Sequence, residues 1–171
     1  SLNVRVSTLD AAKSAVENGA NLIYVGGEVF RPLKPFTFDE LKTAVNFAHE
    51  HGAKIFLNTP RVTRDKVLNE LLELIGRLNT GGVNFDGVLA GNLGALNLVK
   101  NNSTFPIHAD ISFNLFNEVA AEFLKNQGVS QAAASIEMSF AQVKSVVEKS
   151  ALPIEIIIHG STESMISENN F

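Results

Sequence analysis

The 171-residue sequence has the length of one domain and is long enough to bury a hydrophobic core. Its net charge is -4 without any run of like charge, so composition does not support a nucleic-acid groove or an anionic membrane surface, although an RNA substrate is not excluded. Cysteine is absent, which excludes disulfides, thiolate metal sites and cysteine nucleophiles within these residues. We see no spanning segment and no signal peptide, and therefore expect a cytoplasmic protein.

Short apolar runs alternate with helical stretches from one end of the chain to the other. We expect strands near Leu2 to Val6, Leu22 to Val25, Lys54 to Leu57, Gly87 to Leu89, Ile107 to Ala109, Ala132 to Ser135 and Ile154 to His159. We expect helices over Thr8 to Asn18, Phe38 to His51, Arg64 to Asn79, Asn92 to Asn101, Asn114 to Gln127 and Ser139 to Lys149. This alternation is typical of βα units around a parallel sheet.

Seven such units are compatible with an open doubly wound sheet or with most of a β/α barrel. Residue alternation favours the barrel. In the last strand Glu155, Ile157 and His159 share one face, and His108 with Asp110 share one face of the fifth. A sheet covered on both sides would be apolar throughout. We therefore expect an α/β fold, a parallel TIM-like barrel with about seven strands and a polar interior.

We expect residues 1–171 to form a single barrel domain, because no linker or low-complexity segment interrupts them. The chain begins at Ser1 without methionine and stops soon after an expected strand. We therefore expect it to be a fragment of a longer polypeptide. Seven strands also leave edges that another segment, or another copy in a homo-oligomer, would cover.

The chain resembles a known family in several segments that follow one another in the family's order. They read VRVSTLDAAKSAVENGANLIYVGGEVF, LNTPRV, DGVLAGNLGAL, PIHADISFNLFN, SIEMSFAQV and EIIIHGSTESMISEN. These segments resemble the collagenase-like peptidase family U-thirty-two, in particular the barrel module of its longer members. The resemblance implies a β/α barrel. Members of the family are peptidases of unassigned catalytic type or act in oxygen-independent hydroxylation of RNA bases or quinone precursors.

One departure from the family concerns its cofactor. The hydroxylating members hold an iron-sulfur cluster through cysteines, and similar sequences end this block with a Glu-Tyr-Cys step. Here the chain reads Glu168, Asn169, Asn170. Without a thiolate we do not expect an iron-sulfur cluster within these residues.

The catalytic candidates lie at or after the ends of the last two expected strands. His159 ends the last one, where barrel enzymes place their chemistry, and a histidine there acts as a general base or caps the strand. Glu137 either acts as a general acid or base or favours the start of the next helix through its dipole. Glu168 matches a family glutamate. Ser161 lies too close to His159 along one loop to form a triad with it.

Substrate-binding candidates lie at other strand ends. His108 and Asp110 could share a metal or a substrate atom with His159 or Glu137, or simply line the barrel, with Asp110 capping the next helix. A divalent metal is therefore not the favoured interpretation. Arg61, after Thr59 and Pro60, has the charge to bind a carboxylate or phosphate.

The remaining polar candidates have clear structural alternatives. Asn92, between Gly91 and Gly94, belongs to a segment typical of a phosphate-binding turn or of a tight turn alone. Asn114 is interpreted as a helix cap or a ligand contact. Glu155 lies deeper than His159 on the same face, and we expect it to pair with a basic side chain such as Arg5.

Two functions remain open at this point. The first is a hydrolase, a peptidase barrel whose mouth contains Arg61, His108, Asp110, Glu137, His159 and Glu168 and takes a peptide substrate. The second is a non-catalytic or substrate-binding barrel in a longer protein that hydroxylates RNA or quinone precursors. The missing cysteine favours the second slightly.

Overall fold

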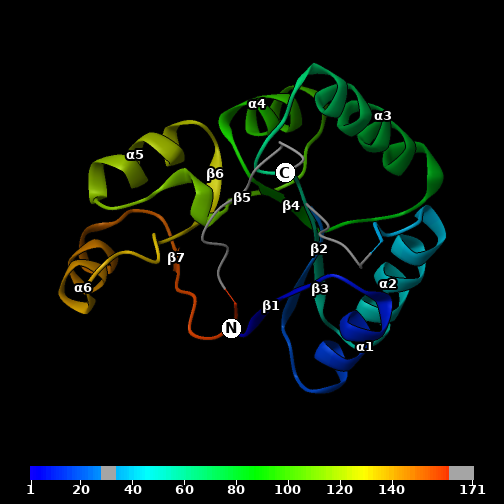
Figure 1. Ribbon diagram of the computed structural model, residues 1–171, viewed down its shortest axis with the longest axis horizontal. Helices are drawn as coiled ribbons and strands as arrows, with labels where there is room; N and C mark the ends of the chain where they lie inside the picture. The colour runs from blue at the N-terminus through cyan, green and yellow to red at the C-terminus, as the bar shows by residue number, and fades with distance from the viewer. Residues whose placement is uncertain (28–33, 162–171) are drawn as a thin grey trace, which may run out of the picture.

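The computed structural model describes residues 1–27 and 34–161, without the side chain of Asn79. Its strands are β1 (Asn3–Val6), β2 (Leu22–Gly26), β3 (Lys54–Asn58), β4 (Gly87–Ala90), β5 (Ile107–Ala109), β6 (Val129–Ala133) and β7 (Ile154–Glu155). They form one parallel sheet in sequence order, which confirms the expected β/α architecture. Figure 1 shows the strands as an arc with the helices outside it.

The helices connect successive strands on the outside of the arc. They are α1 (Leu9–Glu17), α2 (Phe38–Glu50), α3 (Asp65–Gly81), α4 (Leu93–Asn102), α5 (Glu118–Asn126) and α6 (Phe140–Lys149), with a 3-10 turn at Ile111–Phe113. Side-chain caps start several of them: Thr37 and Ser139 form capping boxes with Glu40 and Gln142. Among the described residues, no helix is both long and apolar enough to cross a membrane.

Residue alternation separates two faces of the sheet. Outward residues such as Ile23, Ile55 and Val88 pack with the helices in the main core. Leu22, Tyr24, Phe56 and Leu89 form a second cluster on the inner face. The inward position expected for His108 is confirmed by its contacts with Tyr24 and Phe56. The inner face therefore combines apolar side chains with polar groups such as His108.

The last strand is shorter than expected. Pairing with β6 ends where Ala134 N donates to Glu155 O at 2.9 Å, so His159 does not end a strand. On the other face of this segment, Ile154 packs on the core, whereas Ile158 is 85% exposed, so the segment does not continue as a covered strand. Within the described residues β7 pairs with β6 alone and β1 with β2 alone, so the sheet is open between them (Figure 1).

Two other boundaries also differ from expectation. Helix α5 begins at Glu118 rather than Asn114, because Asn117 caps it by accepting from Ala120 N at 2.9 Å. Asn114 instead ends the 3-10 turn in the left-handed conformation, with φ 50°. Strand β6 begins three residues before Ala132, because Val129 pairs with Ile107 across a register shift.

Candidate functional site

A partly buried carboxylate, that of Glu155, lies in the barrel interior. Glu155 Oε2 accepts hydrogen bonds from Asn3 Nδ2 at 2.6 Å, Gln131 Nε2 at 2.7 Å and Tyr24 OH at 2.8 Å. Asn3 lies on β1 and Tyr24 on β2, so their two bonds reach across the opening of the sheet, whereas Gln131 lies on β6 beside β7. The expectation that Glu155 pairs with a basic side chain such as Arg5 is wrong, because three uncharged donors bind its carboxylate and Arg5 pairs with Asp110.

The same tyrosine binds the interior histidine. Tyr24 OH and His108 Nδ1 lie 2.9 Å apart. Because a phenol has one hydrogen, and Tyr24 donates it to Glu155, we assign the second bond to an Nδ1–H of His108. Burial, and secondarily the charge of Lys54, lower the pKa of His108 to about 4. Burial, followed by Glu155, raises the pKa of Tyr24 well above its usual value. Both groups are neutral at neutral pH.

Arg5 and Asp110 form an ion pair nearer the carboxyl ends of the strands. Arg5 Nη1 lies 3.3 Å from Asp110 Oδ2, and Asp110 Oδ1 accepts from Ile111 N at 2.8 Å. The Asp110 side chain is buried, whereas that of Arg5 remains 35% exposed. The pair thus fixes a cation that is still accessible from the end where barrel enzymes bind their substrates.

Asn58 is a polar residue of this site that the sequence did not single out. It ends β3 on the same face as Phe56, is 2% exposed, and has no hydrogen-bond partner at either Oδ1 or Nδ2. Gly27 lies directly against its amide: a Cβ there would contact Asn58 Nδ2 and would lie 3.5 Å from Arg5 Nη2. The alternation of residues along β3 places Asn58 on the same face as Phe56. That pattern does not indicate that the Asn58 amide is buried without hydrogen-bond partners.

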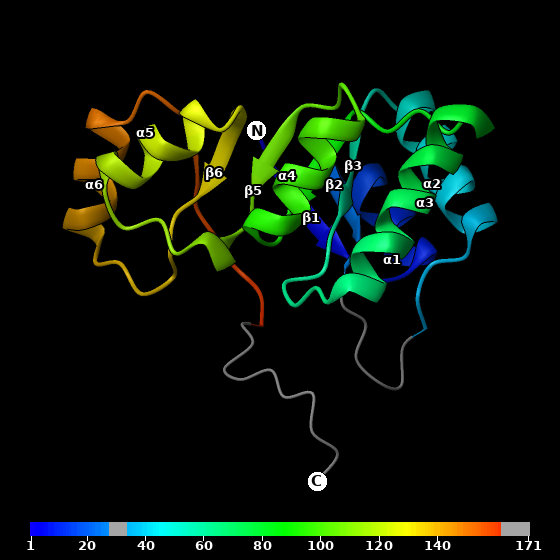
Figure 2. The same cartoon turned by 90° about the horizontal axis from the view of Figure 1, so that it is seen from above.

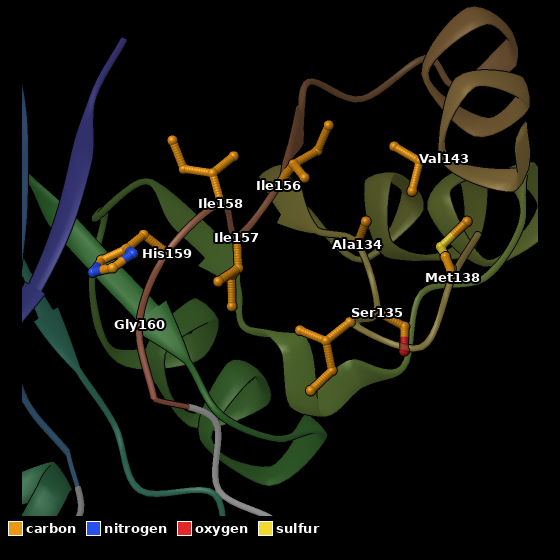
Figure 3. Close-up of a pocket in the computed structure, with 10 residues that line it drawn as sticks. Ala134, Ser135, Met138, Val143, Ile156, Ile157, Ile158, His159 and Gly160 are labelled. Carbon is orange, nitrogen blue, oxygen red and sulfur yellow. The ribbon is translucent and has the colours of Figure 1, made fainter. Parts of the chain in front are cut away.

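A separate pocket contains His159 (Figure 3). It has a volume of about 270 Å³, and its lining includes Ser135, Met138, Val143, Ile156, Ile157 and His159. Figure 3 shows the imidazole of His159 pointing away from Met138 and Val143. Both His159 and Glu137 are exposed, and Glu137 N donates to Ser135 Oγ at 3.4 Å. No contact among the described residues joins either of them to His108 or Asp110. Glu168 lies outside the described residues.

Asn92 holds the loop after β3 in place. Its Nδ2 donates to Pro60 O at 3.2 Å, Arg61 O at 3.0 Å and Thr63 Oγ1 at 3.0 Å, while its Oδ1 accepts from Ala95 N at 2.9 Å. Asn92 therefore caps α4 and also positions the Arg61 backbone. Asn114 is exposed on its turn. Substrate contact by Asn92, Arg61 and Asn114 stays a prediction.

The donor set of this chain does not fit an iron-sulfur cluster. The sequence contains no cysteine, so these residues offer no thiolate to iron. Across residues 1–27 and 34–161, no three His, Asp or Glu side chains converge in a way that would hold a metal ion. The site offers hydrogen-bonding groups and one guanidinium instead.

The fold and this site define a parallel β/α barrel-type protein with its polar groups inside and at the carboxyl ends of its strands. A family model described as Peptidase family U32 matches residues 7–171, and the chain belongs to that family. The solved structure of a U32 peptidase superimposes with a TM-score of 0.70, covering 90% of this chain and 66% of the other at 11% identity, a likeness of fold.

Two curated relatives carry names that concern RNA. The 23S rRNA 5-hydroxycytidine C2501 synthase of Escherichia coli (strain K12) is 28% identical over 88% of this chain and 23% of its own length. The tRNA hydroxylation protein P1 of Bacillus subtilis (strain 168) is 26% identical over 90% of this chain and 37% of its own length. The chain therefore spans less than half the length of these relatives.

Proposed function

We propose that this chain is the substrate-binding barrel of a protein that acts in RNA hydroxylation. The similarity to two proteins named for hydroxylation of rRNA and tRNA supports this, since each match covers most of the chain. In this proposal the barrel binds and orients RNA. The redox step belongs to other residues of a longer polypeptide or to a partner, because the donor set here does not fit an iron-sulfur cluster.

The observation that carries the proposal is the fixed, accessible guanidinium of Arg5. Asp110 holds one nitrogen of Arg5, and more than a third of the side chain remains exposed at the carboxyl ends of the strands. RNA presents phosphates and base oxygens, which are the acceptors that an arginine recognises. A local cation of this kind also provides RNA contact in a chain whose net charge is -4.

The alternative is a peptidase, which the family name and the solved U32 peptidase suggest. In this version His159, Glu137 and Glu168 act as catalytic residues, and the apolar pocket beside His159 receives a side chain of a peptide. A hydrolase needs an activated nucleophile or water. Among the described residues, no histidine hydrogen-bonds to a serine or threonine hydroxyl.

The test is RNA binding by the purified protein, followed by fluorescence anisotropy of a labelled single-stranded RNA. Arg5→Met should weaken binding about 10-fold, while Lys149→Met should leave it unchanged. Lys149 makes a matched control because its substitution removes the same charge at the last turn of α6, away from the carboxyl ends of the strands. Equal affinities for both variants, or peptide cleavage that His159→Ala abolishes, would overturn the proposal in favour of the peptidase.

A further inference from the structure

The orphaned amide of Asn58 is the feature of this site that no role described above explains. Its Oδ1 and Nδ2 are buried, and neither has a partner. Buried amides are normally hydrogen-bonded, because removing one from water without replacement bonds is costly. Within residues 1–27 and 34–161, Asn58 therefore has no protein partner for its amide.

The two orphaned atoms define the chemistry of that partner. Nδ2 requires a hydrogen-bond acceptor and Oδ1 requires a donor, and both atoms belong to the same planar amide group. A phosphate or carboxylate only accepts, so it would leave Oδ1 unsatisfied. The edge of a nucleobase offers a donor next to an acceptor, and a planar amide pairs with it in two bonds.

The surroundings of Asn58 favour a ligand that is also anionic or rich in oxygen. Arg5 Nη2 and Asn58 Nδ2 both lie near the same point beside Gly27. Arg5 pairs with Asp110 through Nη1, and no protein acceptor is found for its Nη2 among the described residues. A nucleotide supplies both groups that these neighbours require: a base edge for the amide and an oxygen for the guanidinium.

We propose that Asn58 binds the edge of an RNA base through Oδ1 and Nδ2, with Arg5 binding an oxygen of the same nucleotide. This assignment rests on the proposed RNA substrate and adds the residue that contacts the base. Gly27, with φ 85°, lies against the amide in this structure, and the assignment therefore requires the Gly26–Gly27 turn to move aside when the base binds.

The experiment compares two RNAs with the same phosphates. One contains a single cytidine flanked by abasic residues, and the other is abasic throughout. Wild-type protein should prefer the cytidine RNA. Asn58→Ala should weaken binding to it about 10-fold and leave binding to the abasic RNA unchanged. Asn58→Asp, which keeps the shape of the side chain but loses the donor, should also lose the preference. Asn101→Ala, at an exposed site on α4, is the control and should retain it.

The other possible results distinguish failure of this inference from failure of the proposed function. If wild-type protein binds both RNAs and Asn58→Ala retains the preference, the amide holds only structural water and this inference fails while the proposed function stands. If Asn58→Ala weakens binding to both RNAs equally, the inference is also overturned, because the substitution then affects the fold rather than recognition of the base. If wild-type protein binds neither RNA, the proposed function fails and this inference with it. Binding of a glutamine-containing peptide that depends on Asn58 would make the ligand an amide rather than a base.

Discussion

The hydroxyl of Tyr24 on β2 donates a 2.8 Å hydrogen bond to Glu155 on β7, which is 131 residues away in the chain. The bond runs across the barrel interior, because β2 and β7 are not neighbours in the sheet. Together with the bond from Asn3, it links the two sides of the opening between β1 and β7. This network therefore holds the curvature of a sheet that has free edges.

Tyr24→Phe should lower the free energy of unfolding by about 2 kcal/mol, since the bond joins a buried donor to a partly buried carboxylate. The substitution keeps the ring, which packs edge-on against Phe56. Urea unfolding measures the change. The double variant with Glu155→Gln should cost less than the sum of the two single changes, because they remove a shared bond. Strictly additive costs would mean that the bond contributes nothing.

Tyr24 should stay protonated in the folded protein well above the ordinary tyrosine pKa. It is the only tyrosine, and tryptophan is absent, so near-ultraviolet absorbance reports tyrosinate at this one position. Because folding raises the pKa of Tyr24, stability should fall as pH rises above the unfolded value. We expect tyrosinate absorbance to appear together with the loss of helical circular dichroism. Its appearance while the helices persist would contradict the burial of the hydroxyl.

Acidification should weaken the fold through His108. Its pKa is about 4 in the folded protein and 6.5 in the unfolded chain, so the unfolded state binds more protons between these values. This contribution is fully present well above pH 6.5 and falls by about 3 kcal/mol as pH drops to 4. Urea unfolding at several pH values measures it. His108→Gln should reduce this slope, and an unchanged slope would assign it to other groups.

Gly27→Ala should destabilise the protein more than Gly19→Ala does. Both glycines have positive φ, 85° and 92°, so both substitutions carry a backbone cost of about 1 kcal/mol. Only at Gly27 would the new Cβ meet a side chain, the amide of Asn58, whereas nothing lies within 4 Å at Gly19. Thermal unfolding compares the two variants. Equal losses would show that Gly27 does not lie against Asn58.

Asn92→Ala should cost about 2 kcal/mol, because it removes a helix cap and three bonds to the loop after β3. Asn92→Asp keeps the acceptor for Ala95 N and loses the three donor bonds, so its cost should be smaller. Chemical unfolding of both variants gives the comparison. The opposite order would mean that a carboxylate facing the carbonyl oxygens of Pro60 and Arg61 costs more than the cap contributes.

Much of the site was predictable from alternation, and some of it was not. The i, i+2 pattern correctly placed His108 and Asp110 on one inward face, because a strand turns its side chains with a period of two whatever surrounds it. The same reasoning failed for His159, since the run from Ile154 to His159 continues as a strand only while a neighbour pairs with it, and pairing ends at Glu155.

The order of apolar runs and helices in the sequence by itself determined a parallel β/α fold, because periodicity and capping act within a few residues. Only the tertiary structure decided that Arg5 pairs with Asp110, that Tyr24 and Asn3 donate hydrogen bonds to Glu155, and that the Asn58 amide is buried without a partner among the described residues. These contacts join strands far apart in the chain. They depend on the register and curvature of the whole sheet, which no local pattern specifies.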